Sequence, residues 1–508
     1  MTSRRDFLGR LSIAALGPSM LALAQRQALA AGNDSLTIAF PMDIPSWDPL
    51  AAGNSVAASI TKCVFDQPLE LASDLTLGPG VVGGYEWLGN DGKTLALKFR
   101  NDVVFHNGDR LTSDDFKFSF LDRPRAEKTL YIGGVWHGIE GIETPSATDA
   151  IVHFSAPMGI APVMLADIPA YIVPRAYFEK VGRDGFIAKP IGSGPYRLVD
   201  YQRDSQIVLE ANSRHWRGAP AIRRVTFRVV KDPVARAAAL QSGQADVVSQ
   251  LTVREAARLG ALPGKHADLH ETTGIVLLQM VNKGPLRNRD LRLAAHHAID
   301  KQAINTALFS GHATPIYTPA QAGMPAFDPN FKVPFDLARA QALMEQAGYS
   351  ASNPARINLY TTKGVFASDY QVAQAIAQMW QKANIVADIK VLPLPMLFDY
   401  QNHDKFDGPV LKPWGTASGD PGTYSGYMLD PKIPFSIWKS DDIPARLYPL
   451  LAETDAAKRI AGFKVFDKWQ VEQGYSIPLF GMSATLAMRS SLKFTPYRSG
   501  LLLPYSWA

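Results

Sequence analysis

Short segments in which apolar and polar residues alternate recur along the chain and predict β-strands. The clearest of them cover Leu36–Phe40, Thr94–Arg100, Ala150–Phe154, Ser205–Ala211 and Arg223–Val230, with two more in "RINLYTT" from Arg356 and "VADIKVL" from Val386. Several are apolar on one face only, which is typical of strands that pack one side against a core.

Helix signals lie between these strands. Asp232 provides a capping carboxylate, Pro233 suits the first helical position, and Gly243 ends the apolar pattern that follows. Helices are predicted from such patterns over residues 232–243, 336–348, 369–383 and 454–473. Strands and helices follow one another in mixed order without an internal repeat. This order predicts an α/β protein with mixed sheets rather than one doubly wound sheet.

The N-terminus has the features of an export signal. Arg4 and Arg5 form a basic start, and the apolar run 11–24 that follows is shorter than the roughly 20 residues of a spanning helix. We expect cleavage after Ala30, so that residues 1–30 are removed and the mature protein lies in the periplasm. The adjacent arginines resemble a twin-arginine signal, which implies export of a folded chain; an ordinary secretory signal is the alternative.

Charge and cysteine content narrow the class of protein. Residues 1–30 contain four arginines and one aspartate, so the formal charge of +5 falls to about +2 without them. No cluster of Lys or Arg remains, which argues against nucleic acid as a partner. Cys63 is the only cysteine, so no internal disulfide can form, and it lies too far from Ala30 to carry the lipid of a lipoprotein. Since 46% of the residues are hydrophobic, the chain can bury the cores of two or more domains.

Motifs for catalysis or metal binding are weak. "IGSGPY" from Ile191 has a proline where a phosphate loop needs a backbone donor, so it predicts a turn that opens a strand. Neither a Gly-x-Ser-x-Gly nor an HExxH motif occurs. His266 and His270 are spaced for one helix face, but Pro263 and Gly264 just before them favour a loop and a strand. We therefore expect no enzyme activity, cofactor or protein-built metal site, with an exported hydrolase as the alternative.

Two long segments carry a family resemblance. "DGKTLALKFRNDVVFHNGDRLTSDDFKFSF" (91–120) and the stretch from "KPIGSGPYRLVDY" to "SGQADVV" (189–248) resemble the family 5 extracellular solute-binding proteins, the peptide, nickel and related receptors of ATP-driven importers. The resemblance runs in order from Leu36 to the C-terminus. It implies a two-lobed periplasmic binding protein fold of type II, in its large three-domain variant.

The same resemblance implies the domain boundaries. Lobe I is expected to combine residues 31–74, 190–275 and 480–508, with 76–189 as an additional domain attached to it, and lobe II is expected to be 276–479. "FHNGDRLTSDDF" then marks the family rather than the site, because Thr112 or Ser113 can cap a helix whose first turn carries Asp114 and Asp115.

The ligand site is expected in the Gly- and Pro-rich segment 408–431. Trp414 matches the family position that lines the pocket, and Thr416 and Tyr424 follow it in the same non-repetitive stretch. Aromatic faces give apolar contact, and nearby glycines such as Gly415 let the backbone approach a ligand closely. An ordinary surface loop with packed aromatic residues is the alternative interpretation.

The charged anchors of the peptide-binding members do not carry over. The position of their aspartate that binds the peptide ammonium is occupied here by Ala417. The position of their cation that binds the peptide carboxylate is occupied here by Asp369. Asp420 matches an acidic residue of the family but not the amine anchor. If Asp369 or Asp420 faced the cleft unpaired, it would favour a cationic ligand, although Asp369 can also cap a helix.

The nickel-binding members offer no closer match. Their carboxylate-binding arginine falls on Ala170, while Trp136 and Tyr131 are candidates to line a cleft. A metal chelate, a sugar or a cationic metabolite is therefore the alternative to a peptide-like ligand.

These observations predict a monomeric periplasmic receptor. It would capture a small solute between two lobes and deliver it to an inner-membrane ABC permease with its ATPase. A ligand drives closure only by as much as it binds the closed form better, and a micromolar ligand has about 8 kcal/mol of binding free energy in all. A folding chaperone or redox accessory is the remaining alternative.

Overall fold

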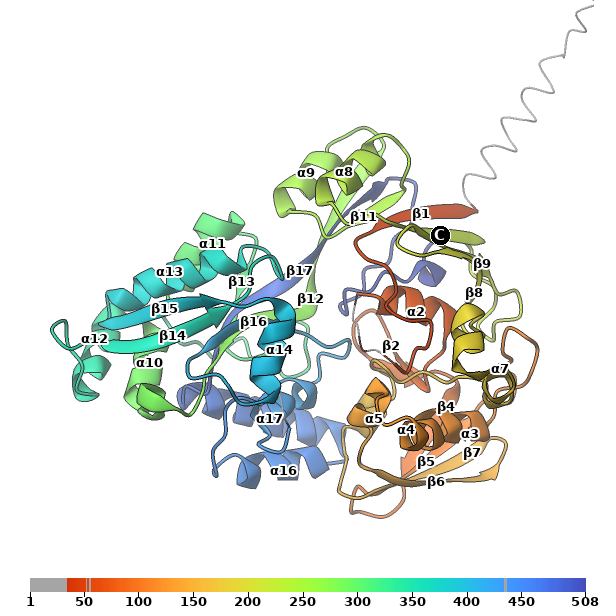
Figure 1. Ribbon diagram of the computed structural model, residues 1–508, viewed down its shortest axis with the longest axis horizontal. Coiled ribbons are helices and arrows are strands. Elements are labelled where there is room, and N and C mark those ends of the chain that lie inside the picture. The colour runs from red at the N-terminus through yellow and green to blue at the C-terminus, as the bar shows by residue number, and fades with distance from the viewer. Residues whose placement is uncertain (1–33, 52, 54–55, 434–435) are drawn as a thin grey trace, which may run out of the picture.

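The computed structural model describes residues 34–51, 53, 56–433 and 436–508, and it forms two lobes side by side (Figure 1). Lobe I is the part whose hydrophobic core draws on residues within 36–247 and 486–507, and lobe II the part whose core draws on residues within 275–480. The predicted signal peptide, residues 1–30, lies outside the described residues. Within the described ranges, no helix is both long enough and apolar enough to cross a membrane.

Lobe I is built on a mixed sheet with helices packed against it. Its strands are β1 (Ser35–Phe40), β8 (Tyr196–Gln202), β9 (Gln206–Ala211), β10 (Arg224–Val229) and β11 (Val247–Ser249). β1 runs parallel to both β10 and β11, whereas β10, β9 and β8 pair antiparallel. The helices are α2 (Ala58–Val64), α7 (Arg175–Ala188), α8 (Pro233–Gln241), α9 (Val253–Gly260) and the short 3₁₀ turn η4 (Pro504–Ser506).

A second, antiparallel sheet of four strands is attached to lobe I. Its order is β4 (Val82–Trp87), β5 (Thr94–Phe99), β7 (Asp149–Phe154) and β6 (Ile139–Ser146). Beside it lie α3 (Ser113–Lys117), the π-helical η1 (Phe118–Asp122), α4 (Arg123–Ala126), α5 (Tyr131–Val135), α6 (Ala161–Met164) and the small ribbon β2 (Leu69–Leu71) with β3 (Leu77–Pro79). Phe116 and Phe120 from these helices join the core of lobe I, so the two sheets share one interior.

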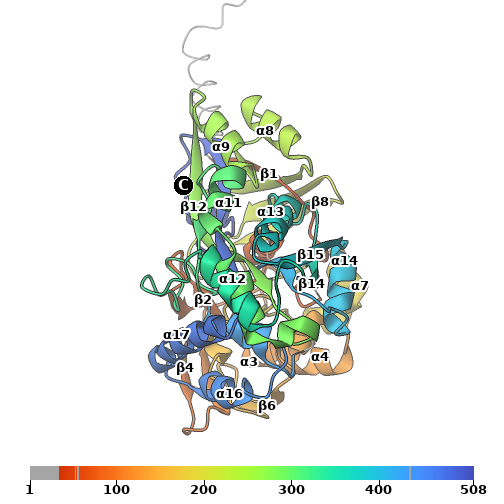
Figure 2. The same ribbon diagram turned by 90° about the vertical axis from the view of Figure 1, so that its left-hand side faces the viewer.

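Helices also pack against the strands of lobe II, and Figure 2 shows α11, α12 and α13 in front of them. Its strands are β13 (Thr314–Pro315), β14 (Ala355–Thr361), β15 (Ile385–Val391) and β16 (Val410–Trp414), and β14 is parallel to β15 and β16. The helices are α10 (Arg289–His297), α11 (Lys301–Phe309), α12 (Leu337–Gln346), α13 (Asp369–Gln381), α14 (Leu394–Asn402), α15 (Ser425–Leu429), α16 (Pro444–Ala452) and α17 (Ala456–Glu472), with the short turns η2 (Gly284–Arg287) and η3 (Pro421–Thr423).

The predicted secondary structure is confirmed in most places. All seven predicted strands are present within a residue or two of their expected bounds, and Asp232 and Asp336 accept backbone hydrogen bonds as helix caps. The helix predicted from residue 454 begins at Ala456, because the carboxylate of Asp455 caps it. Thr112 and Asp115 form a reciprocal capping box at the start of α3.

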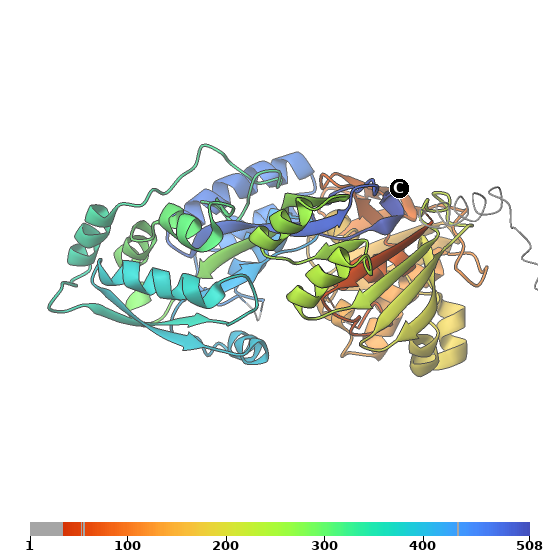
Figure 3. The ribbon, with the colours of Figure 1, turned by 90° about the horizontal axis from the view of Figure 1, so that it is seen from above.

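Two long strands, β12 (Lys265–Gln279) and β17 (Ser476–Arg489), run through both lobes and join them (Figure 3). Their pairing is interrupted where Thr272–Gly274 of β12 lie opposite the single residue Met482 of β17. Gln321 reaches into this bulge, and its Nε2 lies within hydrogen-bond distance of the carbonyl oxygens of Thr272, of Gly274 at 2.8 Å and of Met482 at 3.2 Å. The bulge is therefore a defined feature of the interlobe connection.

The lobes also meet at a second place, where backbone touches backbone. The amide of Gly159 in lobe I donates to the carbonyl of Leu451 in α16 at 2.8 Å. A Cβ on Gly159 would lie 2.0 Å from the carbonyl oxygen of Glu453, and one on Gly92 would lie 3.0 Å from that of Ala452. Glycine at these positions lets the two lobes approach this closely.

We expect the substitution Gly159→Ala to separate the lobes at this contact. The methyl group meets a backbone carbonyl that cannot rotate away, so the free energy of unfolding should fall by about 1–3 kcal/mol and the radius of gyration should rise. Gly134→Ala is the matched control, because a Cβ there meets nothing within 4 Å. Solution scattering profiles that are the same for Gly159→Ala and wild type would contradict the proposed contact.

Candidate functional site

The Gly- and Pro-rich segment identified in the sequence lies between the two lobes. We name residues 413–427, which start at the end of β16, the floor segment. Residues 413–416 are partly or fully exposed, whereas residues 417–426 are buried. The indole N–H of Trp414 donates to the carbonyl of Thr423 at 3.0 Å, so the segment folds back on its own beginning. Its accessible part is therefore the short stretch around Trp414 and Thr416.

Two predicted site residues, Thr416 and Tyr424, tie the floor segment to the hinge strand β12. The Thr416 amide donates to the Tyr424 hydroxyl at 3.2 Å, and the Tyr424 hydroxyl donates to the carbonyl of Thr273. The hydroxyls of Thr416 and Thr423 share a hydrogen bond of 3.0 Å. Tyr424 is 0% exposed, so the prediction that its ring contacts a ligand is wrong for this structure. Its physical role is to hold the loop beside the bulge.

Lobe I binds the floor segment through Asp167. The carboxylate of Asp167 accepts hydrogen bonds from the amides of Ala417 and Ser418, both at 3.3 Å, and from its neighbour Ile168 at 2.7 Å. Burial raises the pKa of Asp167, which these backbone donors partly oppose. Ala417 has no side chain that could anchor a ligand, but its backbone amide contacts Asp167 of the other lobe. Sequence analysis missed Asp167, whose only signal was an acidic residue inside an apolar run.

Asp420 does not face the cleft as an unpaired charge. Its two carboxylate oxygens accept hydrogen bonds from Arg459 of α17 at 2.6 and 2.7 Å, and the side chains are 4% and 2% exposed. Gly422 also donates its amide to Asp420 at 2.9 Å. The expectation that Asp420 favours a cationic ligand is therefore wrong, because its charge is already neutralised within lobe II.

Asp369 is likewise occupied. Its carboxylate accepts from the amides of Gly364 at 2.9 Å and Val365 at 3.0 Å and from the hydroxyl of Thr362 at 2.9 Å, which fixes the loop that leads into α13. Burial raises its pKa, but these hydrogen bonds outweigh burial and hold the pKa below the usual value. Asp369 is thus a structural carboxylate at a helix start, and its prediction as a ligand-binding residue is not supported.

The two aromatic candidates of lobe I differ in exposure. Trp136 is 3% exposed and packs against Phe120 with ring centroids 5.4 Å apart, so it is a core residue and we withdraw it from the site. Tyr131, at the start of α5, is 47% exposed. Figure 1 places α5 on the side of lobe I that lies toward α14 of lobe II. Contact between Tyr131 and a ligand stays a prediction.

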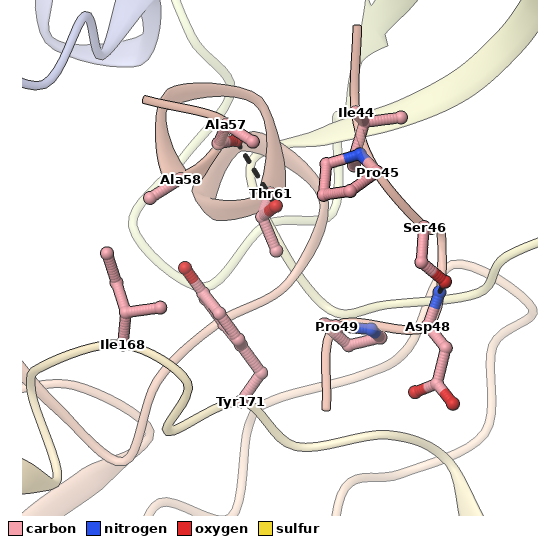
Figure 4. A pocket seen from close by; sticks show the side chains of 10 residues that line it. All are labelled: Ile44, Pro45, Ser46, Asp48, Pro49, Ala57, Ala58, Thr61, Ile168 and Tyr171. Carbon is pink, nitrogen blue, oxygen red and sulfur yellow. Dashed lines mark hydrogen bonds between the residues drawn. The ribbon is translucent and has the colours of Figure 1, made fainter. Parts of the chain in front are cut away.

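A small cavity lies in lobe I beside Ile168, the residue that follows Asp167 (Figure 4). It is lined by Ile44, Pro45, Ser46, Asp48, Pro49, Ala57, Ala58, Thr61, Ile168 and Tyr171. The Tyr171 hydroxyl points toward Ala58 and Thr61 and has no hydrogen-bond partner among the described residues. The free space of about 10 Å³ has room for about one water molecule, far too little for a solute.

Lys412 lies in lobe II two residues before Trp414 and was not identified from the sequence. It is 4% exposed, its Nζ donates to Oε1 of Gln401 in α14 at 2.8 Å, and the ammonium lies 4.9 Å from the centre of the Trp414 ring. Burial alone lowers the pKa of Lys412 to about 7. The missed signal is a lysine inside the otherwise apolar strand "VLKPW".

Asp467 of α17 is a further buried acid, and it contacts the floor segment through Ser425. Its Oδ1 accepts a hydrogen bond from Ser425, and its Oδ2 has no partner among the residues with described positions. Burial, together with the charge of Asp420, raises the pKa of Asp467 to about 7. In the described part of the chain, no three His, Cys, Asp or Glu residues come close enough together to hold a metal ion.

Comparisons with known proteins agree on one family. The family model for bacterial extracellular solute-binding proteins, family 5 Middle, matches residues 71–434. The glutathione-binding protein GsiB of Pectobacterium atrosepticum is 25% identical over 392 residues, which cover 73% of this chain and 74% of that protein. Among solved structures, HbpA2 of Haemophilus parasuis superposes with a TM-score of 0.82 at 21% identity, covering 93% of this chain and 99% of that one. NikA of Brucella suis, solved in complex with Fe(III)-EDTA, gives a TM-score of 0.81 at 22% identity, covering 93% and 99%.

We expect Asp467→Asn to stabilise the protein above pH 7. The folded state raises the pKa of Asp467 to about 7 from 3.8, so it binds the proton more tightly than the unfolded chain and loses stability as the pH rises through this window. Asparagine can still accept from Ser425 and has no charge to bury, so its free energy of unfolding at pH 8 should exceed that of wild type by about 1–3 kcal/mol. The advantage should shrink toward pH 4.

Denaturant unfolding between pH 4 and 8 measures this difference. Asp441→Asn, at an exposed position of lobe II, is the control for the loss of one carboxylate. A variant Asp467→Asn that is less stable than wild type at pH 8 would show that the ionised carboxylate is needed.

Proposed function

The chain belongs to the family 5 bacterial extracellular solute-binding proteins, and from this premise we propose that its ligand is a small peptide or peptide-like molecule held between the lobes. As a member of this family, the protein is the substrate-binding component of an ABC importer, which passes its solute to a membrane permease and ATPase. The proposal concerns the ligand class, the residues that contact it and the route of export.

One observation carries the peptide-like assignment. The relative with 73% of this chain aligned is a glutathione-binding protein, and glutathione is itself a small peptide with free carboxylates. The accessible part of the floor segment suits such a ligand, since Trp414 offers an aromatic face and Gly415 exposes backbone without a side chain. Thr416 and the exposed Tyr131 complete the contact residues that we propose.

The domain boundaries follow the resemblance and are part of the proposal. Lobe I comprises residues 31–74, 190–275 and 480–508, residues 76–189 form the additional domain, and lobe II comprises 276–479. The receptor works as a monomer in the periplasm. Residues 1–30 direct its export by the twin-arginine route, which implies that the chain folds before it is exported.

A ligand of another class is the second candidate. A structural neighbour was solved with a metal chelate, Fe(III)-EDTA, so a chelate is a reasonable competitor of a peptide. A purely cationic metabolite has less support, because Asp369 and Asp420 are already satisfied within lobe II. An exported hydrolase would differ from both by forming a product.

A ligand panel tests the proposed function. The mature chain, residues 31–508, is unfolded and refolded to remove bound solute and is then titrated with glutathione, di- and tripeptides, Fe(III)-EDTA and a neutral sugar. A receptor shows a melting temperature that rises with ligand concentration, because binding adds RT ln(1 + [L]/Kd) to the free energy of unfolding, and the compound is recovered intact. Binding of the chelate or sugar alone would refute the peptide assignment, and a new product in mass spectrometry would indicate a hydrolase.

We expect Trp414→Ala to weaken binding of the best peptide by about tenfold or more, because a partly buried aromatic ring of the floor segment is removed. Isothermal titration calorimetry measures the change in Kd. Trp87→Ala is the matched control, since Trp87 packs at the four-stranded sheet of lobe I, away from the floor segment. Equal affinity of Trp414→Ala and wild type would remove Trp414 from the site.

A further inference from the structure

The buried lysine beside the floor segment is a cation without a counter-ion. Lys412 is 4% exposed, and among the residues that the structure describes no carboxylate lies within ion-pair distance of its Nζ. Its polar contact is the neutral side chain of Gln401, and the face of the Trp414 ring lies 4.9 Å away. Buried charges in proteins are normally paired, so this one requires a physical explanation.

The strand geometry directs Lys412 toward the site. Residues two apart on a strand point to the same face, so Lys412 and Trp414 lie on one face of β16, which α14 covers through Gln401. Trp414 is the last residue of that strand and lies within the accessible stretch 413–416. The ammonium is thus one strand step behind the aromatic face that we propose to contact the ligand.

The surroundings of Lys412 provide no alternative partner for its charge. Across the sheet, its neighbour in β12 is the apolar Leu277. On the same face lie the phenol rings of Tyr360 from β14 and Tyr400 from α14. The nearby charges are engaged elsewhere, since Asp407 accepts from the Tyr360 hydroxyl at 2.8 Å and Lys405 pairs with Asp399 at 2.7 Å.

We infer that Lys412 is a specificity residue that binds an anionic group of the ligand, a carboxylate, next to the Trp414 ring. The inference rests on the proposed function and extends it: the receptor selects peptide-like solutes that carry a free carboxylate in the interlobe site. An ammonium in this apolar setting forms a strong charge-assisted hydrogen bond to a carboxylate, and the long lysine side chain can leave Gln401 to make it. A neutral analogue leaves the cation unpaired and is rejected.

The titration of Lys412 gives this contact a measurable signature. With a pKa of about 7 the free protein carries a mostly neutral Lys412 at pH 8. A bound carboxylate stabilises the charged form, so binding at pH 8 takes up protons from the buffer. Affinity for the anionic ligand should therefore fall as the pH rises through 7 to 9.

The test compares the tightest-binding peptide of the panel with the same molecule after amidation of its carboxylates. For wild type, amidation should weaken binding about tenfold or more, and calorimetry at pH 8 in buffers of different ionisation enthalpy should show proton uptake. Lys412→Met should bind both forms equally and without proton uptake. Lys412→Arg should keep the preference for the anion but take up no proton, because arginine stays charged.

Two results would overturn the inference. One is a Lys412→Met variant, folded as judged by its melting temperature, that keeps the wild-type preference for the carboxylate; the other is equal binding of both forms by wild type. Either leaves the proposed function intact if peptides still bind. If no peptide binds, succinate replaces the peptide as probe. Binding of succinate that depends on Lys412 would then support the anion site, although the peptide assignment fails. Succinate binding that Lys412→Met does not alter would refute the anion site as well.

Discussion

The structure depends on one connection, the pairing of β12 with β17 across both lobes. Each strand contributes to the sheet of lobe I at one end and of lobe II at the other, so the two cores are fixed to a common ladder of backbone hydrogen bonds. The bulge at Thr272–Gly274 breaks that ladder at the boundary, where Gln321 satisfies the displaced carbonyls. Strands on either side stay rigid while a few residues can absorb a change of angle, which is the usual geometry of a hinge.

Three buried charged groups lie at or beside the floor segment, and their surroundings differ. Asp420 has a bidentate partner in Arg459, so its charge is cancelled within lobe II. Asp167 accepts hydrogen bonds from Ile168 of its own lobe and from backbone amides of the opposite lobe, so part of its hydrogen bonding depends on contact between the lobes. Lys412 has a neutral amide and an aromatic face, so its charge is not cancelled by the described residues. The floor segment and the strand before it thus bring together a structural ion pair, an interlobe contact and the cation that we propose to bind a ligand.

The sequence predicted the local elements well and the site only in part. Strands such as 94–100 and the caps Asp232 and Asp336 were correct because alternation and capping depend on neighbouring residues. Trp414, predicted from the family pattern, lies in the accessible stretch 413–416 and stays a prediction as a ligand contact. The ion pair of Asp420 was not predicted, since its partner Arg459 is 39 residues away. Trp136 was predicted to line the cleft but is buried, because the exposure of a side chain depends on tertiary packing, which a local pattern does not show. Asp167 and Lys412 were missed for the same reason.

The hydrogen bonds between the lobes limit how stable the closed arrangement is without a ligand. Opening breaks the hydrogen bonds of Asp167 to the floor segment and of Gly159 to Leu451, and water replaces each of them, so each is worth only about 0.5–1.5 kcal/mol. Because these contacts are weak, a modest difference in affinity between the closed and the open form lets a ligand drive closure.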